Sequence, residues 1–159
     1  VMLSCIYELR GLENGVYLVW LIFLGSWGCD TCAYCVGKLF GKHKMTPKLS
    51  PKKSVEGLFG GILGSALVGG LYGIFFEAKI YDLANAPLIF AVAGAIGAGF
   101  AVVGDLTASA IKRNNDIKDY GKLIPGHGGI MDRFDSIIFT APIVYYCFKI
   151  MIGNLGGAM

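Results

Sequence analysis

The stretch "APLIFAVAGAIGAGFAVVGDLTASAI" (residues 86–111) decides the fold class of this chain. It stays mainly apolar for longer than the 20 or so residues that a helix needs to cross the hydrocarbon core of a bilayer. Similar stretches predict spans over about 15–37, 55–76 and 134–152, and Pro142 is a candidate kink in the last. Only 16% of the residues are charged, against about 25% in soluble domains. We therefore expect an all-α polytopic transmembrane helix bundle with about four spanning helices.

The basic residues gather in two connections between these spans. Segments 38–53 and 112–133 hold all but three of the 14 lysines and arginines. With four crossings, these two connections lie on the same side, and the positive-inside rule makes that side cytoplasmic. A basic nucleic-acid-binding domain would not have such apolar segments between its charges. The sequence therefore predicts an integral membrane protein with two basic cytoplasmic loops and no nucleic-acid partner.

Small residues are frequent in the predicted spans. Cys29, Cys32 and Cys35 form C-x2-C-x2-C, a spacing that metal or cluster ligands also use. A helix would place them along one stripe, and no fourth ligand is nearby in the sequence, so the pattern favours packing over ligation. The 24 glycines are expected at close helix contacts, as in the pair Gly57 and Gly61.

Two acidic residues, Asp30 and Asp105, lie inside predicted spans. An ionisable residue there faces the bundle interior or a wet cavity and marks a candidate functional site. A structural ion pair with Lys or Arg is the alternative. Helical spacing places Ser109 and Lys112 on the face of Asp105, and Tyr34 on the face of Asp30. These faces offer oxygen donors for a cation and an ammonium for a phosphate.

The stretch "KLIPGHGGIMDRFDS" (residues 122–136) begins the fourth span. Asp132 and Asp135 are three residues apart and share a helix face. Acids are favoured in a first helical turn, but this does not explain their combination with a glycine-rich turn. Because Mg²⁺ takes carboxylate oxygens and bridges to substrate phosphates, we expect a metal and polyphosphate site with Mg²⁺ on Asp105 and Asp132. His127 alone is a weak signal that is more typical of a structural residue.

The stretch "SAIKRNNDIKDYGKLIPGHGGIMDRFD" resembles the signature of the phosphatidate cytidylyltransferases, also called CDP-diacylglycerol synthases. The signature positions present are Ser109, Lys112, Arg113, Lys118, Asp119, Gly121, Pro125, His127, Gly128, Gly129, Asp132, Arg133 and Asp135. "DTCAYCVGKLFGKHK" and "LSPKKSVEG" resemble two further segments of the family. They match it at Asp30, Ala33, Tyr34, Gly37, Gly41, Ser50, Pro51, Lys52, Lys53, Ser54, Glu56 and Gly57.

This resemblance implies transfer of a cytidylyl group from CTP to phosphatidic acid, giving CDP-diacylglycerol and pyrophosphate at the bacterial cell membrane. It also implies Mg²⁺, with a second, monovalent cation such as K⁺ as a further expectation. The implied catalytic residues are Asp105, Asp132, Asp135, Lys112 and Arg113. The implied substrate-binding residues are Asp30, Tyr34, Ser50, Lys52, Lys53, Ser109, Lys118, Asp119, His127, Gly128, Gly129 and Arg133.

Members of this family usually have several more spans before the resembling part. We therefore expect residues 1–159 to form a single membrane-embedded catalytic domain, corresponding to the family's C-terminal portion. CTP, phosphatidic acid and the bilayer are the expected partners, and a homodimer is left open. One alternative is the same chemistry on another lipid phosphate. A second is an ion-coupled transporter, with Asp30 and Asp105 along a continuous path across the bilayer. A third, a membrane-packing protein, leaves the polar signature unexplained.

Overall fold

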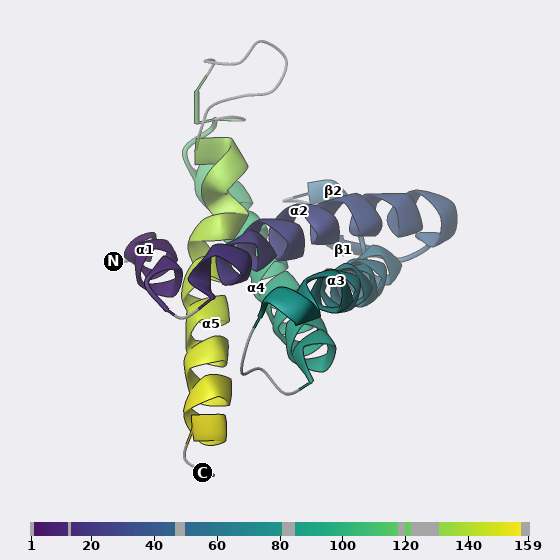
Figure 1. Ribbon diagram of the computed structural model, residues 1–159. Coiled ribbons are helices and arrows are strands. Elements are labelled where there is room, and N and C mark those ends of the chain that lie inside the picture. Colours follow the sequence, from purple (N-terminus) through teal and green to yellow (C-terminus); the bar gives the residue numbers. More distant parts are fainter. Residues whose placement is uncertain are drawn as a thin grey trace.

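The computed structural model of the protein describes residues 2–12, 14–46, 50–80, 85–117, 120–121 and 131–156. Figure 1 shows that long helices dominate this part of the chain. They are α2 (Gly15–Phe40), α3 (Val55–Phe76), α4 (Ala86–Asn114) and α5 (Met131–Gly156). All four are long and apolar enough to cross a bilayer, which confirms the four predicted spans and the all-α class. The last continues past Pro142.

Helix α3 packs through a stripe of small residues. Its buried positions recur every fourth residue, at Gly57, Gly61, Ser65, Gly69 and Gly73. A methyl group added at Gly69 would lie 2.6 Å from a backbone oxygen of α4, and one at Gly61 would lie 2.9 Å from a sulfur of α2. The helix backbones therefore meet more closely than larger side chains allow, which confirms the predicted role of Gly57 and Gly61.

Buried hydroxyl groups join neighbouring helices. The Ser65 hydroxyl on α3 lies 3.2 Å from the Gly25 carbonyl oxygen on α2 and 3.2 Å from the Gly94 carbonyl oxygen on α4. The Thr140 hydroxyl on α5 lies 3.4 Å from the Gly97 carbonyl oxygen of α4. Such hydrogen bonds between helices fix their relative positions in the bilayer.

The largest buried cluster lies away from the basic loops. A short helix, α1 (Ser4–Arg10), adds Leu9 to it, and the rings of Phe90 from α4 and Phe148 from α5 meet at 5.4 Å. Sequence analysis did not predict α1. Large apolar side chains elsewhere point outward, including Leu63 and Leu67 of α3, as expected for surfaces that face lipid chains.

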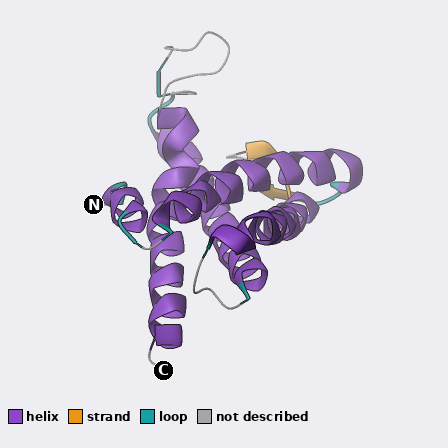
Figure 2. Ribbon diagram, viewed as in Figure 1, coloured by secondary structure: helices purple, strands orange, loops and turns teal. Residues whose placement is uncertain are grey.

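A small hairpin joins α2 to α3 (Figure 2), where sequence analysis expected only a polar connection. Its strands, β1 (Lys44–Thr46) and β2 (Ser50–Ser54), are antiparallel, with Lys44 opposite Ser54. Met45 packs against a buried cluster of α2 and α4 side chains that includes Val102. The hairpin therefore folds back onto the helices, and its second strand runs directly into α3.

Two contacts fix the base of this hairpin. The Ser54 hydroxyl accepts a hydrogen bond of 3.1 Å from the Gly57 N–H and so caps α3. Glu56 in the first turn of α3 accepts hydrogen bonds from the His43 backbone N–H at 3.2 and 3.3 Å, and its Oε1 lies 2.7 Å from His43 Nδ1. The hairpin is thus tied to the helix that follows it.

The helix ends that lead into the basic segments point in different directions. In Figure 1 the C-terminal part of α2 runs toward the right, whereas the end of α4 and the start of α5 rise together toward the top. The second strand β2 lies beside α2. The helix pairs α2–α3 and α4–α5 therefore diverge toward the ends that carry the basic segments.

Candidate active site

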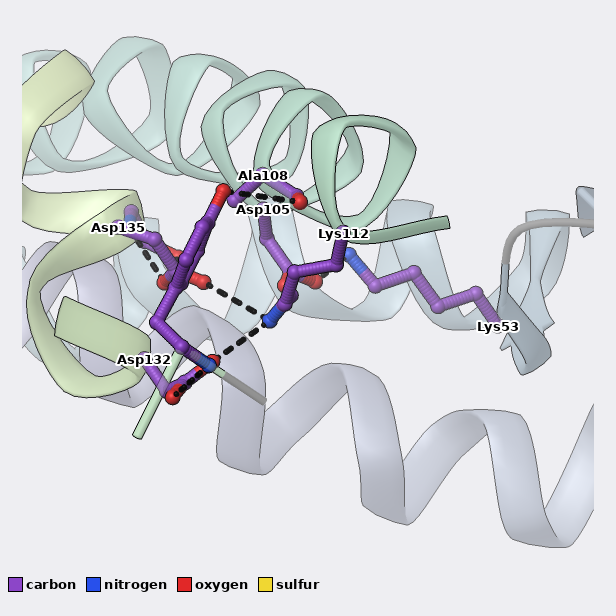
Figure 3. A network of polar contacts seen from close by, with 8 residues as sticks. Lys53, Asp105, Ala108, Lys112, Asp132 and Asp135 are labelled. Carbon is purple, nitrogen blue, oxygen red and sulfur yellow. Dashed lines mark hydrogen bonds and ion pairs between the residues drawn. The ribbon is translucent and has the colours of Figure 1, made fainter. Parts of the chain in front are cut away.

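Lys112, near the end of α4, lies between two carboxylates at the start of α5 (Figure 3). Its Nζ is 2.9 Å from Asp132 Oδ1 and 3.9 Å from Asp135 Oδ2. Its side chain is 12% exposed, and those of Asp132 and Asp135 are 8% and 9% exposed. Because charges are strongly coupled when water is scarce, these three groups act as a unit. Their contacts confirm that Asp132 and Asp135 share a helix face.

Tyr120 completes this cluster, although sequence analysis did not select it. Its backbone N–H donates a hydrogen bond of 2.9 Å to Asp132 Oδ2, and its hydroxyl donates one of 3.2 Å to the Ala108 carbonyl oxygen. Its ring centroid lies 5.2 Å from Lys112 Nζ, close enough for a cation–π contact. The available signal was its place between two matched signature positions, Asp119 and Gly121.

A second ion pair joins the hairpin to the middle of α4. Lys53 of β2 pairs with Asp105, approaching it from the side opposite to Asp132 and Asp135 (Figure 3). Asp105 also interacts electrostatically with Lys112 and Asp135. The two basic segments therefore meet at one set of acids. The ion pair expected under the structural alternative exists, and it belongs to this larger network.

A pocket of about 200 Å³ opens beside this network, between α2, the hairpin, α3 and α4. Four predicted substrate-binding residues contribute to its wall, together with apolar side chains. The lining residues are Asp30, Ala33, Tyr34, Met45, Ser50, Lys53, Ser54, Gly57, Leu58 and Val102. Since Lys53 belongs to both the wall and the Asp105 ion pair, the pocket and the charged cluster form one continuous site.

Other predicted site residues have less definite surroundings. Ser109 is half-buried on α4, and Arg113 is exposed in the last turn of that helix. Lys52 belongs to β2 and Arg133 to α5, but their side chains lie outside the described part of the structure. The predictions that fall wholly outside the described residues are those for Lys118, Asp119, His127, Gly128 and Gly129.

The donor set suits a hard cation that also contacts substrate. Asp30, Asp105, Asp132 and Asp135 bring four carboxylates, and Lys53 and Lys112 bring two ammonium groups. Counted as ionised groups, these side chains have a formal net charge of −2, which a divalent cation would offset. Mg²⁺ typically takes one or two carboxylates and completes its coordination with phosphates and water. Carboxylate oxygens in this network fit that requirement.

The three cysteines of α2 are placed for packing. A methyl group added at Gly61 would meet the Cys29 sulfur, and one at Gly64 would meet the Cys32 side chain, while Cys35 is exposed. Within the described ranges, no three His, Cys, Asp or Glu side chains gather closely enough to enclose a metal by themselves.

Comparison with known proteins gives consistent matches over nearly the whole chain. The model of the cytidylyltransferase family matches residues 2–151. A phosphatidate cytidylyltransferase of Staphylococcus aureus (strain COL) is 40% identical over 140 residues, which cover 87% of this chain and 50% of the relative. The protein of the same name from Staphylococcus epidermidis (strain ATCC 12228) is 42% identical over the same shares. The chain thus spans about half the length of these relatives.

Proposed function

Because this chain belongs to the cytidylyltransferase family, we propose that it forms the catalytic part of a membrane enzyme that makes CDP-diacylglycerol. The reaction transfers the cytidylyl group of CTP to phosphatidic acid and releases pyrophosphate. The observation that carries this proposal is the meeting of Lys53–Asp105 and Lys112–Asp132 in one charged network within a bundle of four candidate membrane spans. A polar nucleotide and a lipid phosphate can both reach such a site, one from water and the other from the bilayer.

In the proposed reaction, a phosphate oxygen of phosphatidic acid attacks the α-phosphorus of CTP in line with the leaving group. A new P–O bond forms, the bond between the α-phosphorus and its bridging oxygen breaks, and pyrophosphate leaves with the bonding electrons. The attacking phosphate is already ionised, so no side chain has to remove a proton. Positioning and charge stabilisation are therefore what the protein must supply.

Lys112 and Lys53 are suited to hold phosphate oxygens. In the structure each ammonium lies against a carboxylate, Asp132 or Asp105. When substrate binds, we propose that each lysine turns part of its hydrogen bonding toward phosphate, and Arg113 at the exposed end of α4 contacts the outer phosphates. Asp135, close behind Lys112 at 3.9 Å, keeps that ammonium charged and oriented.

Asp105 and Asp132 are the proposed Mg²⁺ ligands. Mg²⁺ held by these two carboxylates would supply positive charge against the charge that develops on the leaving pyrophosphate. The network charge of −2 and the hard oxygen donors support this assignment. The lysines bonded to the same carboxylates would then hold the ligand oxygens in place when the ion is absent.

The site is proposed to face the cytoplasm. Both segments that lead into it are lysine-rich, and such loops remain on the cytoplasmic side of a membrane. CTP is available there. An ion-coupled transporter is less well supported, because its acids should follow a path across the bilayer, whereas Asp105, Asp132 and Asp135 act on one another within one network.

The test is product formation in phosphatidate-containing vesicles. The protein is incubated with labelled CTP and Mg²⁺, and CDP-lipid is separated from free nucleotide. Wild type should form product only when Mg²⁺ and phosphatidate are both present. Asp132→Asn should lower the rate at least about 100-fold, the scale of losing one strong electrostatic contact to the transition state.

Asp116→Asn is the matched control, since Asp116 is an exposed acid just beyond α4. It should retain the wild-type rate. Vesicles that carry an ether-linked lipid phosphate in place of phosphatidate distinguish the closest alternative substrate. Full activity of Asp132→Asn in correctly inserted protein would remove Asp132 from the metal site, and product from the ether lipid alone would replace the proposed acceptor.

A further inference from the structure

The pocket between the hairpin and α2 differs chemically from the neighbouring lysine cluster. Among the lining residues that the structure describes, the one lysine, Lys53, is already paired with Asp105, and Asp30 adds a second carboxylate close to that pair. Counted as ionised groups, these three side chains have a formal net charge of −1. Such surroundings disfavour a phosphate group. They favour an uncharged ligand that presents N–H donors to a carboxylate.

The pocket walls also fit a flat, mostly apolar ring. Met45, Leu58 and Val102 supply apolar surface from the hairpin, α3 and α4. Tyr34 stands on α2 one turn beyond Asp30, and with 62% of its surface exposed it can place its ring over a ligand. Aromatic side chains bind bases by stacking on their faces. The volume of about 200 Å³ is many times the space that one water molecule needs, so the pocket has room for one pyrimidine ring.

We propose that this pocket is the nucleobase subsite and that Asp30 selects cytosine over uracil. This inference rests on the proposed function, because it assumes that CTP is the nucleotide used. Cytosine carries an amino group at position 4, which donates hydrogen bonds and is the group that Asp or Glu side chains recognise on this base. Uracil carries a carbonyl oxygen at the same position, which a carboxylate repels.

The position of Lys53 gives the nucleotide its direction. Lys53 lines the pocket and also pairs with Asp105, which interacts with Lys112 across the network. With the base in the pocket, the ribose and phosphates extend past Lys53 toward Lys112 and Asp132. Lys53 interacts electrostatically with Asp30 but is paired with Asp105. A hydrogen bond from a nucleobase would therefore give the exposed Asp30 carboxylate a partner of its own.

The test compares CTP, UTP and the triphosphate of 2-pyrimidinone riboside, in which hydrogen replaces the amino group. For the wild-type protein, kcat/KM for the 2-pyrimidinone nucleotide should be about 10-fold to 100-fold below that for CTP. UTP should be at least as poor. In Asp30→Ala this preference should fall to within about 3-fold, because neither nucleotide then meets the carboxylate.

Two further variants make the result specific to Asp30. Asp30→Asn keeps the side-chain shape and should also reduce the preference for CTP. Thr31→Ala, at the next position of α2 but outside this pocket, should keep the full preference. Equilibrium dialysis of the same three nucleotides gives a binding readout that does not depend on turnover.

The outcomes separate this inference from the proposed function. If wild type treats CTP and the 2-pyrimidinone nucleotide alike, or if Asp30→Ala keeps the wild-type preference, the pocket is not the base subsite. If no CDP-lipid forms but CTP still binds more tightly than the analogue through Asp30, the proposed reaction fails and the subsite stands. If the wild-type protein binds none of the three nucleotides, both the base subsite and the proposed reaction are overturned.

Discussion

Replacing Lys112 by methionine removes an ammonium group and leaves a side chain of similar length. The structure places that ammonium 2.9 Å from Asp132 and 3.9 Å from Asp135, with all three side chains at most 12% exposed. Removing one partner of a buried ion pair typically costs about 3–5 kcal/mol. Tyr120 still donates its N–H to Asp132, so we expect a loss near the lower limit, about 3 kcal/mol of unfolding free energy.

The assay is denaturant unfolding in mixed micelles, followed by the fluorescence of Trp20 and Trp27. Arg113→Met, at the exposed neighbouring position, serves as the control and should change stability by less than about 0.5 kcal/mol. The double variant Lys112→Met with Asp132→Asn should lose less unfolding free energy than the two single variants lose together, by about 1–3 kcal/mol. Strict additivity, or a Lys112→Met variant as stable as wild type, would refute the coupled cluster.

Two predictions concern the scaffold around the site. Gly69→Ala should cost about 1–3 kcal/mol in the same unfolding assay, because its methyl group would lie 2.6 Å from the Phe90 carbonyl oxygen. Gly99→Ala is the control, since a methyl group there meets no atom within 4 Å, and it should be neutral or slightly stabilising. Glu56→Ala should release the hairpin from His43 and speed its cleavage by trypsin several-fold. Glu56→Gln keeps an acceptor oxygen for the His43 N–H and should be cleaved at close to the wild-type rate; equal cleavage of all three proteins would contradict the role of this contact.

The sequence predicted the spanning helices well because long apolar runs have few structural alternatives. The second span was expected at 55–76 and α3 is Val55–Phe76. Ends that pass into polar sequence were less certain, as for the first span, which was expected to stop near residue 37 and continues to Phe40. There the helix is completed by local hydrogen bonds that hydropathy does not register.

The hairpin could not be predicted in the same way. Residues 44–54 are rich in lysine and contain two prolines, a composition more typical of a loop. Its strands are stabilised by tertiary contacts, namely Met45 against the buried cluster and His43 against Glu56. Single-sequence patterns do not contain such contacts.

Individual site residues were predictable, but their partners were not. The acids stood out because they interrupt apolar spans, and Asp132 and Asp135 share a face by simple spacing. Lys53 contacts Asp105, and the Tyr120 backbone binds Asp132. Both contacts depend on how α4, α5 and the hairpin pack. Spacing within one helix gives no information on that packing.

The most direct test of the central claim follows the fate of each CTP phosphate. The protein is incubated with phosphatidate vesicles, Mg²⁺ and CTP labelled either at the α-phosphorus or at the γ-phosphorus. Cytidylyl transfer predicts that the α label enters the lipid product and the γ label appears in pyrophosphate. A γ label in the lipid would indicate phosphoryl transfer instead, and the absence of both labels from the lipid would contradict the proposed function.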